Sequence, residues 1–141
     1  MYNYLQYPIG LIETSYGGTP IRLWSSSEAQ SVCNESHVPT LWNAMVYPFL
    51  QTTIRAAIWY QGESDCDHND LEYATKYYCA FPELIKDWRY EWSLNSDTSP
   101  DFPFGFVQLS TWDDENEEKY STNITNTTCG DNFGMFCILK I

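Results

Sequence analysis

A short apolar run that ends abruptly in a polar turn is the most restrictive feature of this 141-residue chain. The run is Ile-Arg-Ala-Ala-Ile-Trp at residues 54–59, and Gln61, Gly62, Glu63 and Ser64 follow it almost at once. Six mostly apolar residues bounded by turn signals predict a short buried strand. In a parallel α/β sheet, ligands bind beyond the C-terminal ends of the strands. The turn is therefore a candidate site, and a plain polar strand-to-loop turn is the alternative.

Two other apolar runs predict strands of the same sheet. One covers residues 9–13 and the other covers residues 104–109. The pair Gly17-Gly18 follows the first run and gives the backbone freedom to turn tightly there. Because helical segments separate the runs, we expect these two segments and residues 55–60 to be adjacent parallel strands.

Two helical segments are predicted between the strands. Residues 41–51 carry apolar side chains at helical spacing, with Thr40 as a candidate cap. Pro48 predicts a kink or an early end of this helix. Residues 71–92 predict a second helix, which Pro82 is expected to break or kink.

The second helical segment sorts its side chains by face. The apolar face is expected to hold Phe81, Leu84, Ile85 and Trp88, and the solvent face Glu83, Lys86 and Asp87. Residues 25–39, which are rich in Ser, Glu and Asn, are expected to form a loop.

The character of the chain changes near residue 110. Residues 1–110 predict a β-α-β-α-β core, which is about half of a doubly wound α/β domain. Residues 111–141 begin with an acidic run at 113–118 and continue with many Thr and Asn residues. The last dozen residues show no clear period, so this acidic, Thr/Asn-rich tail has no predicted structure or function.

Composition excludes some classes of protein. Seven basic against nineteen acidic residues give a formal net charge of −12. A protein that binds nucleic acid or an anionic membrane needs a basic surface, so neither class is expected.

The five cysteines form no Cys-x-x-Cys pair, so a zinc site is not expected. Because their number is odd, at least one thiol has no partner in the chain. Acceptor sequons at Asn34, Asn123 and Asn126 favour a secretory route.

Five sequence blocks, in order, resemble the sialate O-acetylesterases, a branch of the SGNH-type carbohydrate esterases. The blocks are residues 8–26, Leu-Trp-Asn-Ala-Met at 41–45 with Pro48, Trp-Tyr-Gln-Gly-Glu-Ser at 59–64, Phe81-Pro82 with Leu84-Ile85 and Asp87-Trp88-Arg89, and Pro103-Phe104-Gly105 with residues 107–110. The resemblance implies that residues 1–110 are the central part of an SGNH-type esterase domain, with part of a three-layer α/β/α parallel-sheet fold, and that the chain is a central fragment of such an enzyme. It also implies a serine hydrolase that removes O-acetyl groups from sialic acids, without a cofactor or a metal.

The resemblance assigns roles to residues of the two glycine-containing turns. It places the oxyanion hole at Gly17 or Gly18 and at the amide of Gln61, which stands where the wider superfamily usually has Asn. Such a donor stabilises the negative charge that develops on the reacting carbonyl oxygen. Glu63 is expected to accept hydrogen bonds from the first loop rather than to act as a catalyst. Trp24 and Tyr60 are weaker candidates for sugar contacts, whereas core packing is expected for Trp59.

The sequence lacks a match to the family's nucleophile turn, Gly-Gln-Ser-Asn, and to its C-terminal Asp-x-x-His pair. Asp65 to His68 satisfies Asp-x-x-His literally, but it lies far earlier in the chain than the family's pair. A metal site formed by Asp65, Asp67, His68 and Asp70 and a nucleophilic Ser15 are further alternatives without family support. We therefore expect the chain alone to be inactive.

Other functions remain open at this point. A non-catalytic glycan-binding or scaffold relative that lost the triad fits the same residues, as does an SGNH acetylesterase acting on other polysaccharides. For the main interpretation, a sialate O-acetylesterase-like hydrolase, the expected partner is an O-acetylated sialic acid or glycan substrate. The expected location is secreted or lysosomal, with a signal peptide that this sequence does not begin with.

Overall fold

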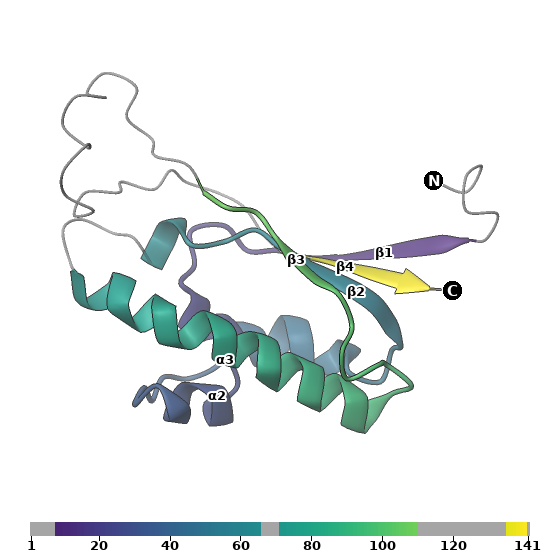
Figure 1. Cartoon of the computed structure of the whole chain (residues 1–141), viewed down its shortest axis with the longest axis horizontal. Coiled ribbons are helices and arrows are strands. Elements are labelled where there is room, and N and C mark those ends of the chain that lie inside the picture. Colours follow the sequence, from purple (N-terminus) through teal and green to yellow (C-terminus); the bar gives the residue numbers. More distant parts are fainter. Residues whose placement is uncertain (1–7, 66–70, 110–134, 141) are drawn as a thin grey trace, which may run out of the picture.

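The computed structural model describes residues 8–65, 71–109 and 135–140, with the backbone alone for residues 71–74 and 135–140. In chain order its elements are β1 (Ile9–Thr14), the 3₁₀ turn η1 (Ile21–Trp24), α2 (Ser27–Val32), the π-helical turn η2 (Trp42–Val46), the 3₁₀ turn η3 (Tyr47–Phe49), β2 (Ile54–Trp59), the 3₁₀ turn η4 (Glu63–Asp65), α3 (Leu71–Asn95), β3 (Phe104–Phe106) and β4 (Met135–Lys140). Figure 1 shows the sheet lying along the long helix α3.

The four strands form one sheet in the order β1-β4-β2-β3. β2 and β3 pair in parallel, and α3 lies between them in the sequence, as the α/β class requires. β4 is antiparallel to both β1 and β2. β1, β2 and β3 therefore point the same way, as expected, but the predicted adjacency of the first two is wrong because β4 separates them.

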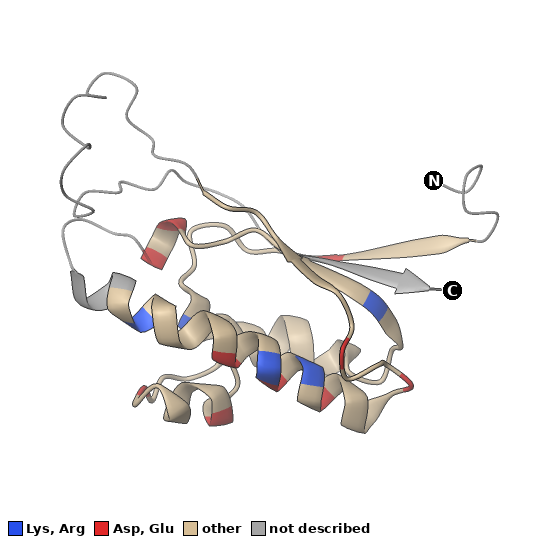
Figure 2. Cartoon of the chain, viewed as in Figure 1, with Lys and Arg blue, Asp and Glu red and all other residues tan. Residues whose placement is uncertain are grey.

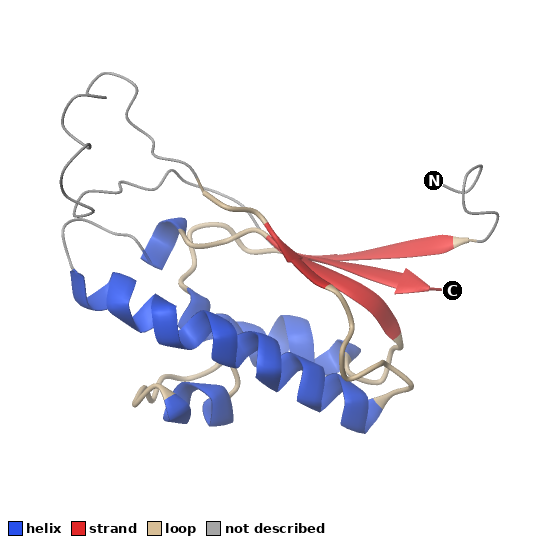
Figure 3. Cartoon of the chain, in the orientation of Figure 1, coloured by secondary structure: helices blue, strands red, loops and turns tan. Residues whose placement is uncertain are grey.

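The helices cover one face of this sheet in the described part of the chain (Figure 3). That part therefore contributes the sheet and one helical layer of an α/β/α arrangement. The third strand ends at Phe106, three residues earlier than predicted, although the Val107 N–H still donates to the Trp59 carbonyl at 2.9 Å.

The segment expected to be a loop, residues 25–39, contains helix α2. Ser26 caps this helix, because its side chain accepts a hydrogen bond from the Ala29 N–H at 3.1 Å, and Glu28 lies in the first turn. The loop prediction was wrong because it weighted polar composition above this capping pattern.

The segment at residues 41–51 is helical but irregular. The π-helical turn η2 passes directly into η3, where Pro48 occupies the first turn. The helical path therefore continues to Phe49 instead of ending near Pro48, and the alternative, a kink, stays a prediction. Thr40 does not act as the cap, since its hydroxyl donates to the Val38 carbonyl at 3.3 Å. The predicted apolar positions Leu41, Val46 and Leu50 are buried.

Helix α3 continues through Pro82, so the predicted break is wrong and the alternative, a kink, stays a prediction. Proline removes one backbone donor from a helix interior, and burial of the surrounding face outweighs that loss here. The buried residues recur every four positions, at Ala80, Leu84, Trp88 and Trp92. Asp87, expected to face water, is instead half-buried against α2.

Buried aromatic residues fill the space between the helices and the sheet. We call Trp24, Trp59, Trp88, Trp92 and Phe102 the aromatic core. The Trp59 ring meets Trp24 and Trp88 edge to face, with centroid separations of 5.9 and 5.6 Å. These T-shaped contacts are a preferred aromatic geometry, and they confirm core packing for Trp59.

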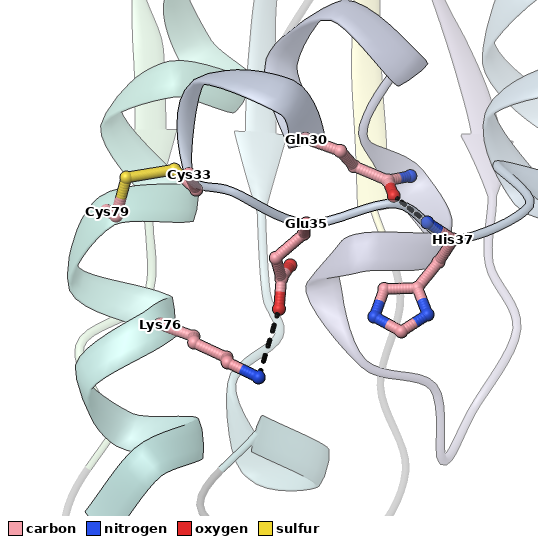
Figure 4. A network of polar contacts seen from close by, with 6 residues as sticks. All are labelled: Gln30, Cys33, Glu35, His37, Lys76 and Cys79. Carbon is pink, nitrogen blue, oxygen red and sulfur yellow. Dashed lines mark hydrogen bonds and ion pairs between the residues drawn. A yellow bond between two sulfur atoms is a disulfide. The ribbon is translucent and has the colours of Figure 1, made fainter.

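A disulfide joins Cys33 at the end of α2 to Cys79 in α3 (Figure 4). Two polar contacts lie beside it. The Glu35 carboxylate is 3.8 Å from the Lys76 ammonium, and the Gln30 side-chain oxygen accepts from the His37 N–H at 2.7 Å. The loop after α2 is thus attached to α3 covalently and by charge.

Candidate functional site

The two glycine-containing turns meet. Gln61 follows β2, and its side-chain Nε2 donates to the Thr19 carbonyl at 3.0 Å. Asp65, in η4, accepts the backbone N–H of Ile21 through Oδ2 at 2.8 Å. We call Thr19, Ile21, Gln61 and Asp65 the polar junction. Figure 2 shows the acidic residues of η4 in red near the end of β2.

The polar junction confirms that the two turns come within side-chain reach of each other. The reason differs from the one predicted, because β1 and β2 are not neighbours in the sheet. The approach depends on hydrogen bonds between residues 42 and 44 positions apart in the sequence.

Gln61 commits both of its amide protons to the protein. One goes to the Thr19 carbonyl and the other to Asp65 Oδ2. The residue is 7% exposed, and its Oε1 has no hydrogen-bond partner among the described residues. A donor to a substrate oxyanion would therefore have to leave one of these two acceptors. The oxyanion role of Gln61 stays a prediction, and it requires that Gln61 break one of these two hydrogen bonds when the substrate binds.

The glycine pair lies in an exposed turn. Gly18 has φ +70°, and a Cβ built there would meet no atom within 4 Å. The backbone conformation, rather than a lack of space, thus favours glycine at this position. Thr19 stabilises the turn, since its hydroxyl donates to the Tyr16 carbonyl at 2.7 Å and accepts from the Trp24 indole N–H at 3.0 Å. No contact in the structure tests Gly17 or Gly18 as oxyanion donors.

The carboxylate that accepts from the first loop belongs to Asp65, two residues beyond the predicted Glu63. Asp65 is 4% exposed, and this burial raises the pKa of its carboxyl. Hydrogen bonds from Gln61 and Ile21 and the nearby charge of Arg22 act in the opposite direction, while Glu35 adds to the rise. The predicted role of Glu63, as an acceptor of hydrogen bonds from the first loop, stays a prediction.

The alternatives built on Asp65 gain no support. Asp67, His68 and Asp70 lie outside the described residues. Across the described ranges, no three His, Cys, Asp or Glu side chains gather as metal ligands would. Ser15, the alternative nucleophile, donates its hydroxyl proton to the Glu13 carboxylate at 2.9 Å.

The aromatic candidates for sugar contacts differ in burial. Trp24 is buried in the aromatic core, and a sugar needs an open ring face, so this placement does not support a platform role for Trp24. Tyr60 is half-buried, and its role remains a prediction.

An apolar cleft of about 250 Å³ lies beyond the C-terminal ends of β2 and β3. Gln61 and Gly62 form one wall, Tyr77 and Phe81 of α3 another, and residues 106–109 a third. The sequence predicted a site at the turn after β2 but not the wall formed by residues 106–109, because it extended the third strand through residue 109. The polar Gln108, two residues after the observed end of β3, was the available signal.

Gly62 keeps this cleft open. Its φ is +137°, a conformation that side chains rarely adopt, and a Cβ there would lie 3.0 Å from Leu109 Cδ1 and 3.6 Å from the Tyr77 hydroxyl. That hydroxyl also donates to the Gln61 carbonyl at 3.4 Å. Glycine is thus required at the point where the turn meets the cleft.

Among the predicted glycosylation sites, only Asn34 lies within the described residues. It is exposed in the turn after α2, with φ 56°, directly beside the disulfide-bonded Cys33. Asn123 and Asn126 lie outside the described residues. In the part of the chain that the structure covers, no helix is long and apolar enough to cross a membrane.

Comparisons with known proteins agree on one family. The sialate O-acetylesterase of Pongo abelii is 44% identical over 127 residues, which cover 78% of this chain and 23% of that protein. The human protein of the same name is 43% identical over 127 residues, again 78% of this chain and 23% of the relative. The mouse protein is 37% identical over 163 residues, covering 85% and 29%.

The chain thus spans about a quarter of the length of the curated relatives that it matches. The family model described as carbohydrate esterase, sialic acid-specific acetylesterase, matches residues 2–136, which is nearly the whole sequence. The chain belongs to the sialic acid-specific acetylesterase family of carbohydrate esterases.

Proposed function

We propose that this chain forms the oxyanion side of a sialate O-acetylesterase-like serine hydrolase, a carboxylic ester hydrolase of carbohydrate metabolism. The substrate class is an O-acetylated sialic acid or a glycan that carries one. The observation that carries the proposal is the polar junction beside an apolar cleft at the C-terminal ends of parallel strands, in a chain of this family. Such a position is where α/β folds bind ligands.

The proposed mechanism uses Gln61 as an electrostatic stabiliser. When a serine attacks the acetyl carbonyl, negative charge develops on the carbonyl oxygen, and a fixed N–H donor lowers the barrier. Gln61 would supply one amide proton, and the Gly17-Gly18 turn would supply a backbone N–H. The apolar cleft next to Gly62 would exclude water from this side of the ester.

This assignment predicts a kinetic signature in a longer esterase that contains the segment. Gln61→Ala should lower kcat by about 100- to 1,000-fold with little change in KM, because an oxyanion donor acts mainly in the transition state. Gln51→Ala, at an exposed position before β2, is the matched control and should change neither constant. A raised KM with an unchanged kcat would instead make Gln61 a substrate-binding residue.

The isolated chain should not hydrolyse p-nitrophenyl acetate above a protein blank, because its sequence matches neither the family's nucleophile turn nor its Asp-x-x-His pair. Turnover that disappears in Ser15→Ala or His68→Ala would contradict this expectation. A second candidate function is glycan binding without catalysis, for which the apolar cleft beside Gln61 and Gly62 offers a concave surface. Binding of O-acetylated sialic acid by the isolated chain, without turnover, would support that alternative.

We propose in addition that the protein is a glycoprotein of the secretory route, secreted or lysosomal. Disulfides persist in oxidising compartments, and the Cys33–Cys79 bond ties two helices of the described structure. The exposed Asn34 provides an accessible acceptor for a glycan. Expression behind a signal peptide, followed by a glycosidase mobility shift that Asn34→Gln reduces, tests this proposal. Secretion of unglycosylated chain with free thiols at Cys33 and Cys79 would contradict it.

A further inference from the structure

Asp65 is placed to hold both turns of the polar junction at one point. Its Oδ2 accepts the Ile21 N–H at 2.8 Å, at the start of η1, and also the amide of Gln61. The side chain is nearly fully buried, so water does not compete for these bonds. A buried carboxylate that bonds to two turns forty residues apart constrains their relative position more than a surface ion pair would.

The hydrogen bonds also determine which end of the Gln61 amide faces which neighbour. Both neighbours of Nε2, the Thr19 carbonyl and the Asp65 carboxylate, are acceptors. Rotating the amide by half a turn would bring Oε1 against these two acceptors and leave its protons elsewhere. The present orientation leaves Oε1 buried and without a partner among the described residues, which is a cost that the two bonds outweigh.

Two other charged groups act on Asp65. Arg22 in η1 favours its ionised form, and Glu35 from the loop after α2 disfavours it. Glu35 is itself 3.8 Å from Lys76 of α3, which offsets part of its charge (Figure 4). Asp65 therefore bonds directly to Ile21 and Gln61, and its charge is influenced by groups in η1 and in the loop after α2.

We propose that Asp65 is the positioning residue of the candidate site, holding one amide proton of Gln61 while the bond to the Thr19 carbonyl is the one exchanged for the substrate oxygen. The assignment rests on the proposed function, in which Gln61 is the oxyanion donor. The charged Asp65 bond is stronger than the neutral bond to Thr19, so the weaker one gives way first. The amide then turns about its bond to Asp65 without losing its anchor.

The inference can be tested on the isolated 141-residue chain by NMR of the Gln61 side-chain amide and the Ile21 backbone amide. Asp65→Asn should keep the fold, as judged by circular dichroism, and should speed proton exchange at both amides by about 10-fold or more, because a neutral acceptor holds them less firmly. Asp97→Asn, the same substitution at an exposed position, is the matched control and should leave both amides unchanged. Unchanged exchange in a folded Asp65→Asn chain, or an equal effect in Asp97→Asn, would overturn the proposal.

A pH titration of the unmodified chain keeps the proposal testable if Asp65→Asn does not fold. The Gln61 and Ile21 amide resonances should move together, with one midpoint above the ordinary range of an aspartate, because burial raises the pKa of Asp65. Separate midpoints, or no movement of either resonance, would overturn it.

Kinetics in a longer esterase that contains this segment separate the inference from the proposed function. Asp65→Asn should lower kcat with little change in KM, and exposed Asp97→Asn should change neither. If the NMR effect is present but kcat is unchanged, the positioning of Gln61 stands and its oxyanion role falls. If the NMR effect is absent, the positioning role falls whatever the kinetics show.

Discussion

The aromatic core and the polar junction lie side by side but are stabilised in different ways. The core depends on buried area and ring contacts that many geometries satisfy, whereas the junction depends on hydrogen bonds with fixed directions. Trp24 belongs to both, because its ring packs on Trp59 and its indole N–H donates to Thr19. Damage to the core should therefore reduce stability broadly, and damage to the junction should act locally.

Trp88→Ala is the largest test of this contrast. Trp88 is 0% exposed, its ring contacts those of Trp59 and Trp92, and its indole N–H donates to the Trp24 carbonyl at 3.2 Å. Truncating a buried tryptophan should cost about 3–5 kcal/mol of unfolding free energy, measured by urea denaturation. Tyr90→Ala, on the same helix at a 60% exposed position, should cost less than about 0.5 kcal/mol. Similar losses in both variants would contradict a core dominated by Trp88.

Removing the Cys33–Cys79 disulfide tests a contribution to stability that belongs to neither the aromatic core nor the polar junction. Its partners are 46 residues apart, so the bond restricts a large loop of the unfolded chain. Replacing both residues by Ser should lower the unfolding free energy by about 2–4 kcal/mol, measured by urea denaturation under non-reducing conditions. A reducing agent should lower the stability of the parent chain but not that of the double variant. Equal sensitivity of the two to reductant would show that this bond is not the stabilising one.

Sequence periodicity predicts the regions that pack by area. The spacing of Leu84, Trp88 and their neighbours identified the buried face of α3, and the run at residues 54–59 identified β2 within the sheet. Helical spacing and apolar runs are informative because the polarity of each residue indicates whether that residue is buried. Pro82 was misjudged for the complementary reason, since tertiary packing outweighs a local backbone rule.

Pairings over long distances were not predictable in the same way. β4 pairs with β1 and β2 across most of the chain, and its residues carry no clear period. The choice of Cys79 as the partner of Cys33 depends on the tertiary fold, because five cysteines permit many pairings. Asp65 was noticed only as part of alternative sites, since its partner Ile21 contributes a backbone N–H that no sequence pattern reveals.

Gly62→Ala probes the point where the polar junction meets the apolar cleft. The added Cβ would be strained by φ +137° and would press on Leu109 Cδ1 at 3.0 Å, so a cost of about 1–3 kcal/mol is expected. Gly105→Ala in β3 is the matched control, because its Cβ would lie 3.9 Å from its nearest neighbour, the Ala57 carbonyl oxygen, and should cost less than about 0.5 kcal/mol. Thermal unfolding of the two variants measures the difference. Equal losses would show that Gly62 is not specially constrained.

Asp87 offers the smallest and most selective test. Burial raises the pKa of its carboxyl as it does for Asp65, but Asp87 is only half-buried and belongs to the helical layer. Burial raises its pKa to about 6, the charges of Glu91 and Glu28 add to the rise, and hydrogen bonds from Ser26 oppose it. The folded chain therefore holds this proton more tightly than the unfolded chain does. Its stabilising effect is complete below about pH 4 and is lost as the pH rises through about 6.

Asp87→Asn should remove this pH dependence and raise the unfolding free energy above pH 7 by about 1 kcal/mol, a value reduced for solvent screening of a half-buried group. Melting temperatures from pH 4 to 8 should converge at the acid end, where Asp87 is protonated, and diverge at neutral pH. Asp101→Asn, at an exposed position, is the control and should follow the parent chain throughout. If Asp87→Asn ran parallel to the parent chain across this range, its carboxyl would not be the titrating group. Among the described residues, Asp65 is the other carboxyl whose pKa is raised by burial. A pH-dependent loss of stability would then arise at the polar junction rather than between helices α2 and α3.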